Sequence, residues 1–116
     1  MKRDQLFAVL ALSCFMFASC ASGPSKNPFG PYSAAETFYK KGNYPKAIEK
    51  YQEYLGGYPQ GNLAAIAEYY IAKSYAASGD TPKARESFKR VTEKFPGTSW
   101  AEFAKEQLKM MQDTMA

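Results

Sequence analysis

The feature that most constrains the fold is an internal repeat of 37 residues. When the sequence is shifted by that distance, glycines, prolines, alanines and aromatic residues fall on their own kind. The matched pairs include Gly42/Gly79, Pro45/Pro82, Ala47/Ala84, Tyr51/Phe88, Pro59/Pro96, Ala67/Ala104 and Ile71/Leu108. Self-similarity at such a period is typical of small units that stack on one another and share a continuous core.

Each repeat unit has the start and stop residues of two helices. Pro45 and Pro82 suit the first turn of a helix, where the missing N–H is not needed. Asp80 precedes the second of these prolines and offers a capping oxygen. Gly42 and Gly79 suit the position just after a helix, where a positive φ is common. The pattern predicts helices at 33–41, 45–57, 62–78, 82–95 and 98–113 and no strands. The predicted class is all-α, with two helical hairpin repeats and a capping helix in a right-handed α-solenoid fragment.

The first twenty residues have the composition of a secretory leader. Lys2 and Arg3 are followed by a largely apolar stretch at 6–17 and then by Ala18 and Ser19, directly before Cys20. Twelve helical residues rise about 18 Å, which is too short for a hydrocarbon core of roughly 30 Å. We therefore predict a signal peptide at 1–19 that is removed before Cys20.

The sequence Phe17-Ala18-Ser19-Cys20 resembles a bacterial lipobox, apart from Phe17, where an aliphatic residue is usual. The resemblance implies a covalent diacylglyceryl and N-acyl lipid on Cys20 and no other cofactor. Two alternatives remain, an ordinary cleaved leader and modification at Cys14. In enterobacterial lipoproteins an Asp after the cysteine retains the protein at the inner membrane. Ala21 stands there instead, so the resemblance implies lipid anchoring to the outer membrane, facing the periplasm.

The segment after the cysteine is rich in Gly, Pro, Ser and Asn and lacks a helical or strand period. Such a composition is typical of a tether. We predict a lipidated tether at 20–31 and a helical repeat domain at 32–116.

The spacing of small and aromatic residues resembles the tetratricopeptide repeat (TPR). One unit fills the pattern with Ala35, Phe38, Gly42, Ala47, Tyr51 and Pro59, and the next with Ala72, Tyr75, Gly79, Ala84, Phe88 and Pro96. The longer period resembles TPR proteins of the Gram-negative envelope, among them the Tol-Pal-associated coordinator of cell division and the repeat lipoprotein of the outer-membrane barrel assembly machine. The resemblance implies a non-catalytic scaffold that binds envelope proteins or peptide segments.

In TPR proteins the first helix of each unit lines a binding groove. Transferred to this chain, the groove positions are Tyr32, Glu36, Tyr39, Lys40, Tyr69, Lys73, Ala77, Phe103, Glu106 and Met110. The asparagine clamp by which some members grip a C-terminal carboxylate is absent, because Glu36 and Lys73 hold its positions. The alternative for the tyrosines is that they only complete the packing between helices.

Composition excludes several other functions. The chain has no His and only two cysteines, so a zinc site lacks ligands and we predict no metal. Removal of the leader leaves 13 basic and 10 acidic side chains, spread along the helices, which does not suggest nucleic-acid binding. Glu86 and Arg90, four residues apart, are expected on a solvated helix face.

We find no clustered carboxylates and no nucleophile with a base, and we predict no catalytic residues and no enzyme. The alternatives are a peptidoglycan-associated structural lipoprotein and an accessory part of an envelope enzyme. Two units with a cap are near the lower size for independent stability, so docking on a partner or a homo-oligomer is expected.

Overall fold

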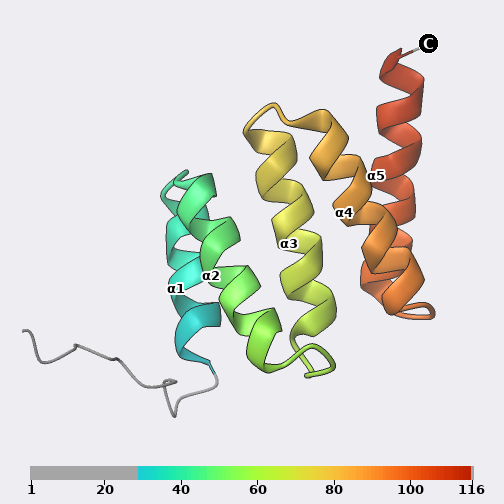
Figure 1. Cartoon of the computed structure of the whole chain (residues 1–116). Coiled ribbons are helices and arrows are strands. Elements are labelled where there is room, and N and C mark those ends of the chain that lie inside the picture. The colour runs from blue at the N-terminus through green and yellow to red at the C-terminus, as the bar shows by residue number, and fades with distance from the viewer. Residues whose placement is uncertain (1–28, 116) are drawn as a thin grey trace, which may run out of the picture.

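The computed structural model describes residues 29–115. Within this range the chain forms five helices and no strand: α1 (Gly30–Lys40), α2 (Tyr44–Gly57), α3 (Ala64–Ala77), α4 (Thr81–Lys94) and α5 (Ser99–Met115). Consecutive helices pack as antiparallel neighbours in the order of the chain (Figure 1). The predicted all-α class with two helical hairpins and a last helix is confirmed. The predicted signal peptide, Cys20 and most of the tether lie outside the described residues.

The predicted helix bounds are close to the observed ones, and the largest difference is at the start of the domain. α1 begins at Gly30 rather than at residue 33, so the last two residues of the predicted tether are helical. Pro31 lies in the first turn of α1, where its fixed φ favours the helix and its missing N–H has no cost. The composition of this segment suggested a tether, although one of its prolines is a helix starter.

Local capping explains where the helices of both hairpins begin and end. The backbone N–H of Lys46 donates to Asn43 Oδ1 at 3.4 Å, and that of Lys83 donates to Asp80 Oδ1 at 3.3 Å. Gly42 and Gly79 have φ of +78° and +84°, a conformation that other residues adopt only with strain. The same glycine and cap recur in both units, as the repeat predicts.

The core consists of two clusters that meet at α3. The first joins α1, α2 and α3 and contains Tyr32, Ala35, Ala47, Tyr51, Tyr54, Ala67 and Ile71. The second joins α3, α4 and α5 and contains Tyr69, Ala72, Ala84, Phe88, Val91 and Ala104. The four consensus alanines are fully buried, which lets the helices approach closely. Because α3 contributes to both clusters, it is apolar on nearly its whole circumference.

Candidate partner-binding face

The predicted groove residues of α1 divide into one buried residue and three accessible ones. Tyr32 is only 7% exposed, and its ring packs edge-to-face on Tyr51 and Tyr54 with centroids 5.7 and 5.6 Å apart. Glu36 and Tyr39 are half-buried, and Lys40 is exposed. Tyr32 therefore holds α1 against α2, whereas the other three residues are at least partly accessible to solvent.

The predicted residues of α3 and α5 divide in the same way. Tyr69 is 9% exposed and packs against Phe88 of α4 and Trp100 of α5. Lys73 is half-buried and Ala77 is exposed. On α5 the exposed positions are Phe103, Glu106 and Met110. Binding by any of these residues stays a prediction, but the burial of the two tyrosines limits what they can offer a partner.

A continuous row of aromatic rings crosses the helices beside these positions. We call it the aromatic row, and it consists of Tyr44, Tyr39, Tyr70, Trp100 and Phe103. Successive ring centroids lie 5.6, 5.0, 6.3 and 5.6 Å apart. The row runs from the start of α2 over α1 and α3 to α5, and four of its members are half-buried while Phe103 is 45% exposed.

A small pocket opens on the aromatic row between α1 and α3. It has a volume of about 130 Å³ and is lined by Glu36, Tyr39, Lys40, Tyr51 and Tyr70. Among residues 29–115 the ion pairs include neither Glu36 nor Lys40, so the pocket presents one free charge of each sign. The site thus combines rigid aromatic walls with a carboxylate and an ammonium, a combination suited to holding a peptide segment.

Three tyrosines of α1 and α2, Tyr32, Tyr39 and Tyr51, remain protonated well above neutral pH. Burial raises the pKa of Tyr32 to about 12, and the nearby Glu36 carboxylate adds to the shift. Burial also raises the pKa of Tyr51 and Tyr39. The hydroxyl groups are therefore neutral donors under physiological conditions.

Alkaline solution is expected to destabilise the fold through Tyr32 and Tyr51. A raised pKa means that the folded state holds the phenolic proton more tightly, so stability is complete below pH 10 and falls as pH rises further. At about 1.4 kcal/mol for each pKa unit, the free energy of unfolding should drop by about 2 to 3 kcal/mol between pH 9 and pH 11. Urea unfolding followed by circular dichroism measures it.

Tyr51→Phe is the matched variant. It removes a phenol that is only 1% exposed and should cut the pH dependence by about half. An identical pH dependence in wild type and Tyr51→Phe would contradict the assignment.

The groove positions transferred from TPR proteins include neither Tyr70 nor Trp100. The 37-residue shift pairs Tyr32 with Tyr69, which selects the buried register, and places Tyr70 opposite Ser33 and Gln107. An aromatic residue that only one unit carries leaves no signal in a self-comparison. The adjacent tyrosines at 69 and 70 were the available hint, because successive side chains on a helix point in different directions.

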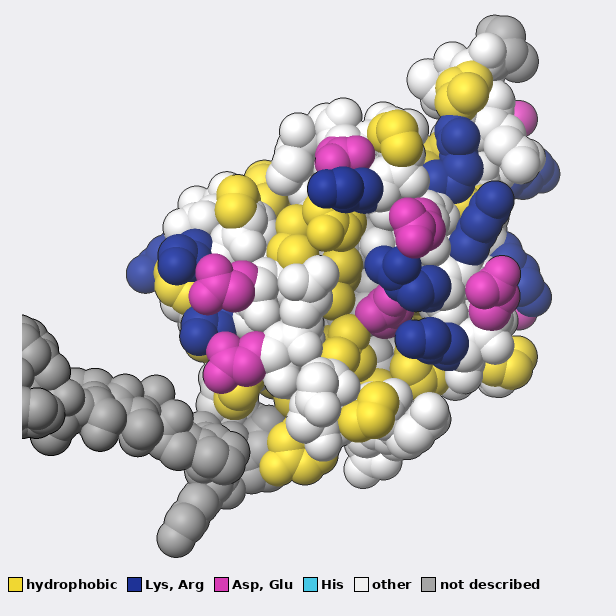
Figure 2. Space-filling view, in the orientation of Figure 1, with side chains coloured by type: hydrophobic (Ala, Val, Ile, Leu, Met, Phe, Trp, Pro, Cys, Tyr) yellow, Lys and Arg dark blue, Asp and Glu magenta, His cyan; other side chains and the backbone are white. Residues whose placement is uncertain are grey.

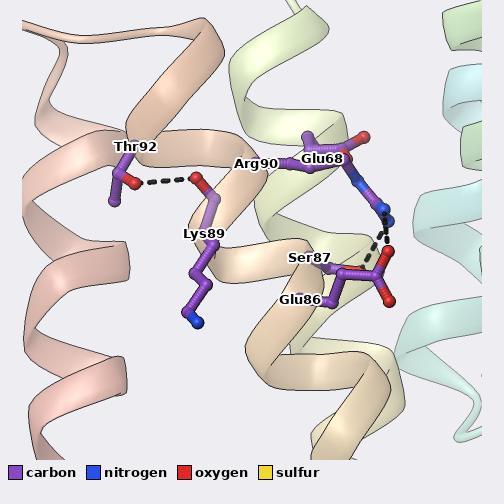
Figure 3. A network of polar contacts seen from close by, with 6 residues as sticks. All are labelled: Glu68, Glu86, Ser87, Lys89, Arg90 and Thr92. Atoms are coloured by element: carbon purple, nitrogen blue, oxygen red, sulfur yellow. Dashed lines mark hydrogen bonds and ion pairs between the residues drawn. The ribbon is translucent and has the colours of Figure 1, made fainter.

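The opposite face, formed by α2 and α4, has apolar side chains between two charged margins (Figure 2). A cavity of about 360 Å³ lies there, and its lining includes Leu55, Ile71 and Phe95. In its wall Arg90 Nε donates to Glu68 Oε1 at 2.6 Å, and Arg90 also contacts Glu86 and Ser87 at 3.0 Å (Figure 3). Arg90 pairs with Glu86 on the predicted solvated face, and it also joins α4 to α3 through the buried Glu68, which the helical spacing did not predict.

Two further findings concern the described range alone. His, Cys, Asp and Glu do not gather anywhere in residues 29–115 into a group that could hold a metal ion. No helix in the same range has the length and apolar composition needed to cross a membrane.

Comparison with known proteins identifies the family. A family model, YfiO, described as outer membrane lipoprotein, matches residues 24–104. The match takes in α1 to α4 and the start of α5, which is more than half of the chain. No curated protein matches. The helical repeats and this match agree, and the chain belongs to the YfiO family of outer membrane lipoproteins.

Proposed function

We propose that this protein is a periplasm-facing scaffold, anchored to the outer membrane through a lipid on Cys20, that binds a partner protein along the aromatic row. The scaffold is non-catalytic and serves an envelope complex of the barrel assembly or Tol-Pal type. Membership of the YfiO family supports the envelope setting. The lipobox resemblance supports the anchor.

The observation that carries the proposal is the continuity of the aromatic row. Its rings come from three successive first helices of a repeat and from the start of α2, so they present a surface longer than one hairpin. Tyrosine and tryptophan offer large amphipathic contact area with few rotatable bonds, and they are enriched where binding energy concentrates. Because each ring is held by a neighbouring ring, little conformational entropy is lost when a partner covers it.

A photoreactive residue placed at Phe103 or at Tyr70 in living cells is expected to crosslink a partner protein. Phe103 is 45% exposed and Tyr70 lies at the centre of the row, whereas Tyr69 is too buried to report. Glu86 is the control position, since its side chain is 69% exposed on the other face. Mass spectrometry of the crosslinked band identifies the partner.

The pattern of bands decides between two forms of the proposal. One stoichiometric partner indicates a subunit of a single complex, and several weaker bands indicate an adaptor. Crosslinks from Glu86 without crosslinks from Phe103 or Tyr70 would show that the aromatic row is not the binding face.

A further inference from the structure

A third cavity lies between α4 and α5, away from the aromatic row. It has a volume of about 430 Å³ and is lined by Arg85, Lys89, Leu108, Gln112 and Met115. None of these residues belongs to the aromatic row or to the small pocket beside it. The cavity therefore needs an explanation of its own.

The internal repeat shows what fills the equivalent space one unit earlier. Subtracting 37 residues converts Arg85 to Ile48, and Gln112 to Tyr75. Both Ile48 and Tyr75 pack against the first core cluster, and Tyr75 also packs against the second, so the equivalent position in the preceding unit carries an aromatic ring among apolar side chains. Between α4 and α5 that ring is replaced by an amide side chain. The cavity thus lies where the preceding unit carries an aromatic side chain.

Arg85 stands where the preceding unit has Ile48, so the cavity between α4 and α5 carries a positive charge. Arg85 Nε is buried and has no hydrogen-bond partner, and Nη2 donates only to the thioether sulfur of Met115, at 2.6 Å. Sulfur is a weak acceptor, and a buried donor without a partner costs free energy. Arg90, one and a half turns along the same helix, shows the contrast, because two carboxylates and a hydroxyl contact it.

Lys89 adds a second cation one turn from Arg85 on α4. Across residues 29–115 the ion pairs involve neither of these two side chains. On the opposing wall from α5, Leu108 and Met115 are apolar and Gln112 is the one polar side chain that lines the cavity. An occupant that satisfies both walls carries a carboxylate next to an aromatic ring.

We propose that this cavity binds a segment of a partner protein in which an aromatic residue lies beside Asp or Glu. The ring enters between α4 and α5, where Tyr75 lies one repeat earlier, and the carboxylate pairs with Arg85 and Lys89. This contact is independent of the aromatic row and would let the scaffold hold two partner segments at once.

The test uses the full chain in detergent, with ¹³C-labelled methionine methyl groups, titrated with the peptide acetyl-Asp-Phe-Glu-amide. Met115 lines the cavity and Met110 is exposed on another side of α5. The expected result is a saturable shift of the Met115 methyl resonance with Met110 unchanged. A shift of Met110 alone, or no shift of either resonance, would overturn the proposal.

Two substitutions test the binding of the ring and of the carboxylate separately, and a third is a control. Gln112→Tyr copies Tyr75 and should fill the cavity, while Arg85→Gln removes the cation. Each change should lower the affinity for the peptide by roughly tenfold, which corresponds to about 1.4 kcal/mol of binding free energy. Lys105→Gln is the control, because Lys105 pairs with Glu102 outside the cavity.

Other outcomes point to other occupants. Equal binding of acetyl-Lys-Phe-Lys-amide would show that the cations play no part. Equal binding by the Gln112→Tyr variant would show that the peptide lies elsewhere. A Met115 shift that grows with protein concentration in the absence of peptide would show that a second copy of the chain fills the cavity. Each of these results overturns the proposal without touching the aromatic row.

Discussion

The Cys20→Ala variant is expected to leave the membrane fraction and to appear in the soluble fraction of the envelope. Each buried CH₂ of an acyl chain contributes roughly 0.8 kcal/mol to membrane binding, so two or three chains hold a protein firmly on the membrane. A protein without any acyl chain has no such anchor. The loss should be close to complete. Fractionation of cells expressing either protein, followed by immunoblotting, measures it.

Cys14→Ala is the matched control, because it removes the other cysteine of the chain and should leave the protein on the membrane. The mass of the purified wild type supplies a second check, since residues 1–19 should be missing and the lipid added. Continued membrane association of Cys20→Ala after an alkaline wash would contradict the lipobox interpretation. An uncleaved leader would then be the alternative anchor, and the mass would reveal it.

Helices could be predicted from the sequence because their signals are local. The glycine, the cap and the proline that bound each hairpin lie within a few residues of one another, and the repeat shows them twice. Where a local signal fits two structures, the predicted start of the helix differs from the observed one. Pro31 fits both a tether and the first turn of a helix, and only packing of Tyr32 against α2 selects the helix.

The candidate site was less predictable because exposure depends on helices far away in the sequence. Two of the ten groove positions transferred from the family fell on buried residues, Tyr32 and Tyr69, whose rings fill the spaces between helices. Tyr70 packs against both core clusters but stays half-buried, with its ring between Tyr39 and Trp100. Its exposure is set by how α1 and α5 lie beside α3, which a pattern of residue types does not contain.

The Arg90–Glu68 contact illustrates the same limit. Glu86 and Arg90 are four residues apart and form the surface pair that helical spacing predicts, at 3.0 Å. Glu68 comes from another helix, 22 residues away, and lies closer at 2.6 Å. A local pattern finds the exposed partner of an arginine and misses the buried one.

Arg90→Met is expected to destabilise the fold much more than Glu68→Gln, although both remove the same ion pair. Glu68 is 6% exposed, so loss of Arg90 leaves a buried carboxylate without its cation. Removing the cation of a buried ion pair while the carboxylate stays should lower the free energy of unfolding by about 2 to 4 kcal/mol. After Glu68→Gln, by contrast, Arg90 keeps Glu86 and Ser87 and has a side chain 35% exposed to water. The expected loss is then about 1 kcal/mol.

The double variant Glu68→Leu with Arg90→Met identifies the cause of that asymmetry. Without the stranded charge most of the loss should be recovered, because an apolar pair of similar volume often replaces a buried ion pair at little cost. Glu86→Gln is the control, and an exposed pair of this kind should contribute no more than about 0.5 kcal/mol. Urea unfolding followed at 222 nm gives all four values. A double variant that loses as much free energy of unfolding as Arg90→Met alone would show that the unpaired Glu68 carboxylate is not the cause.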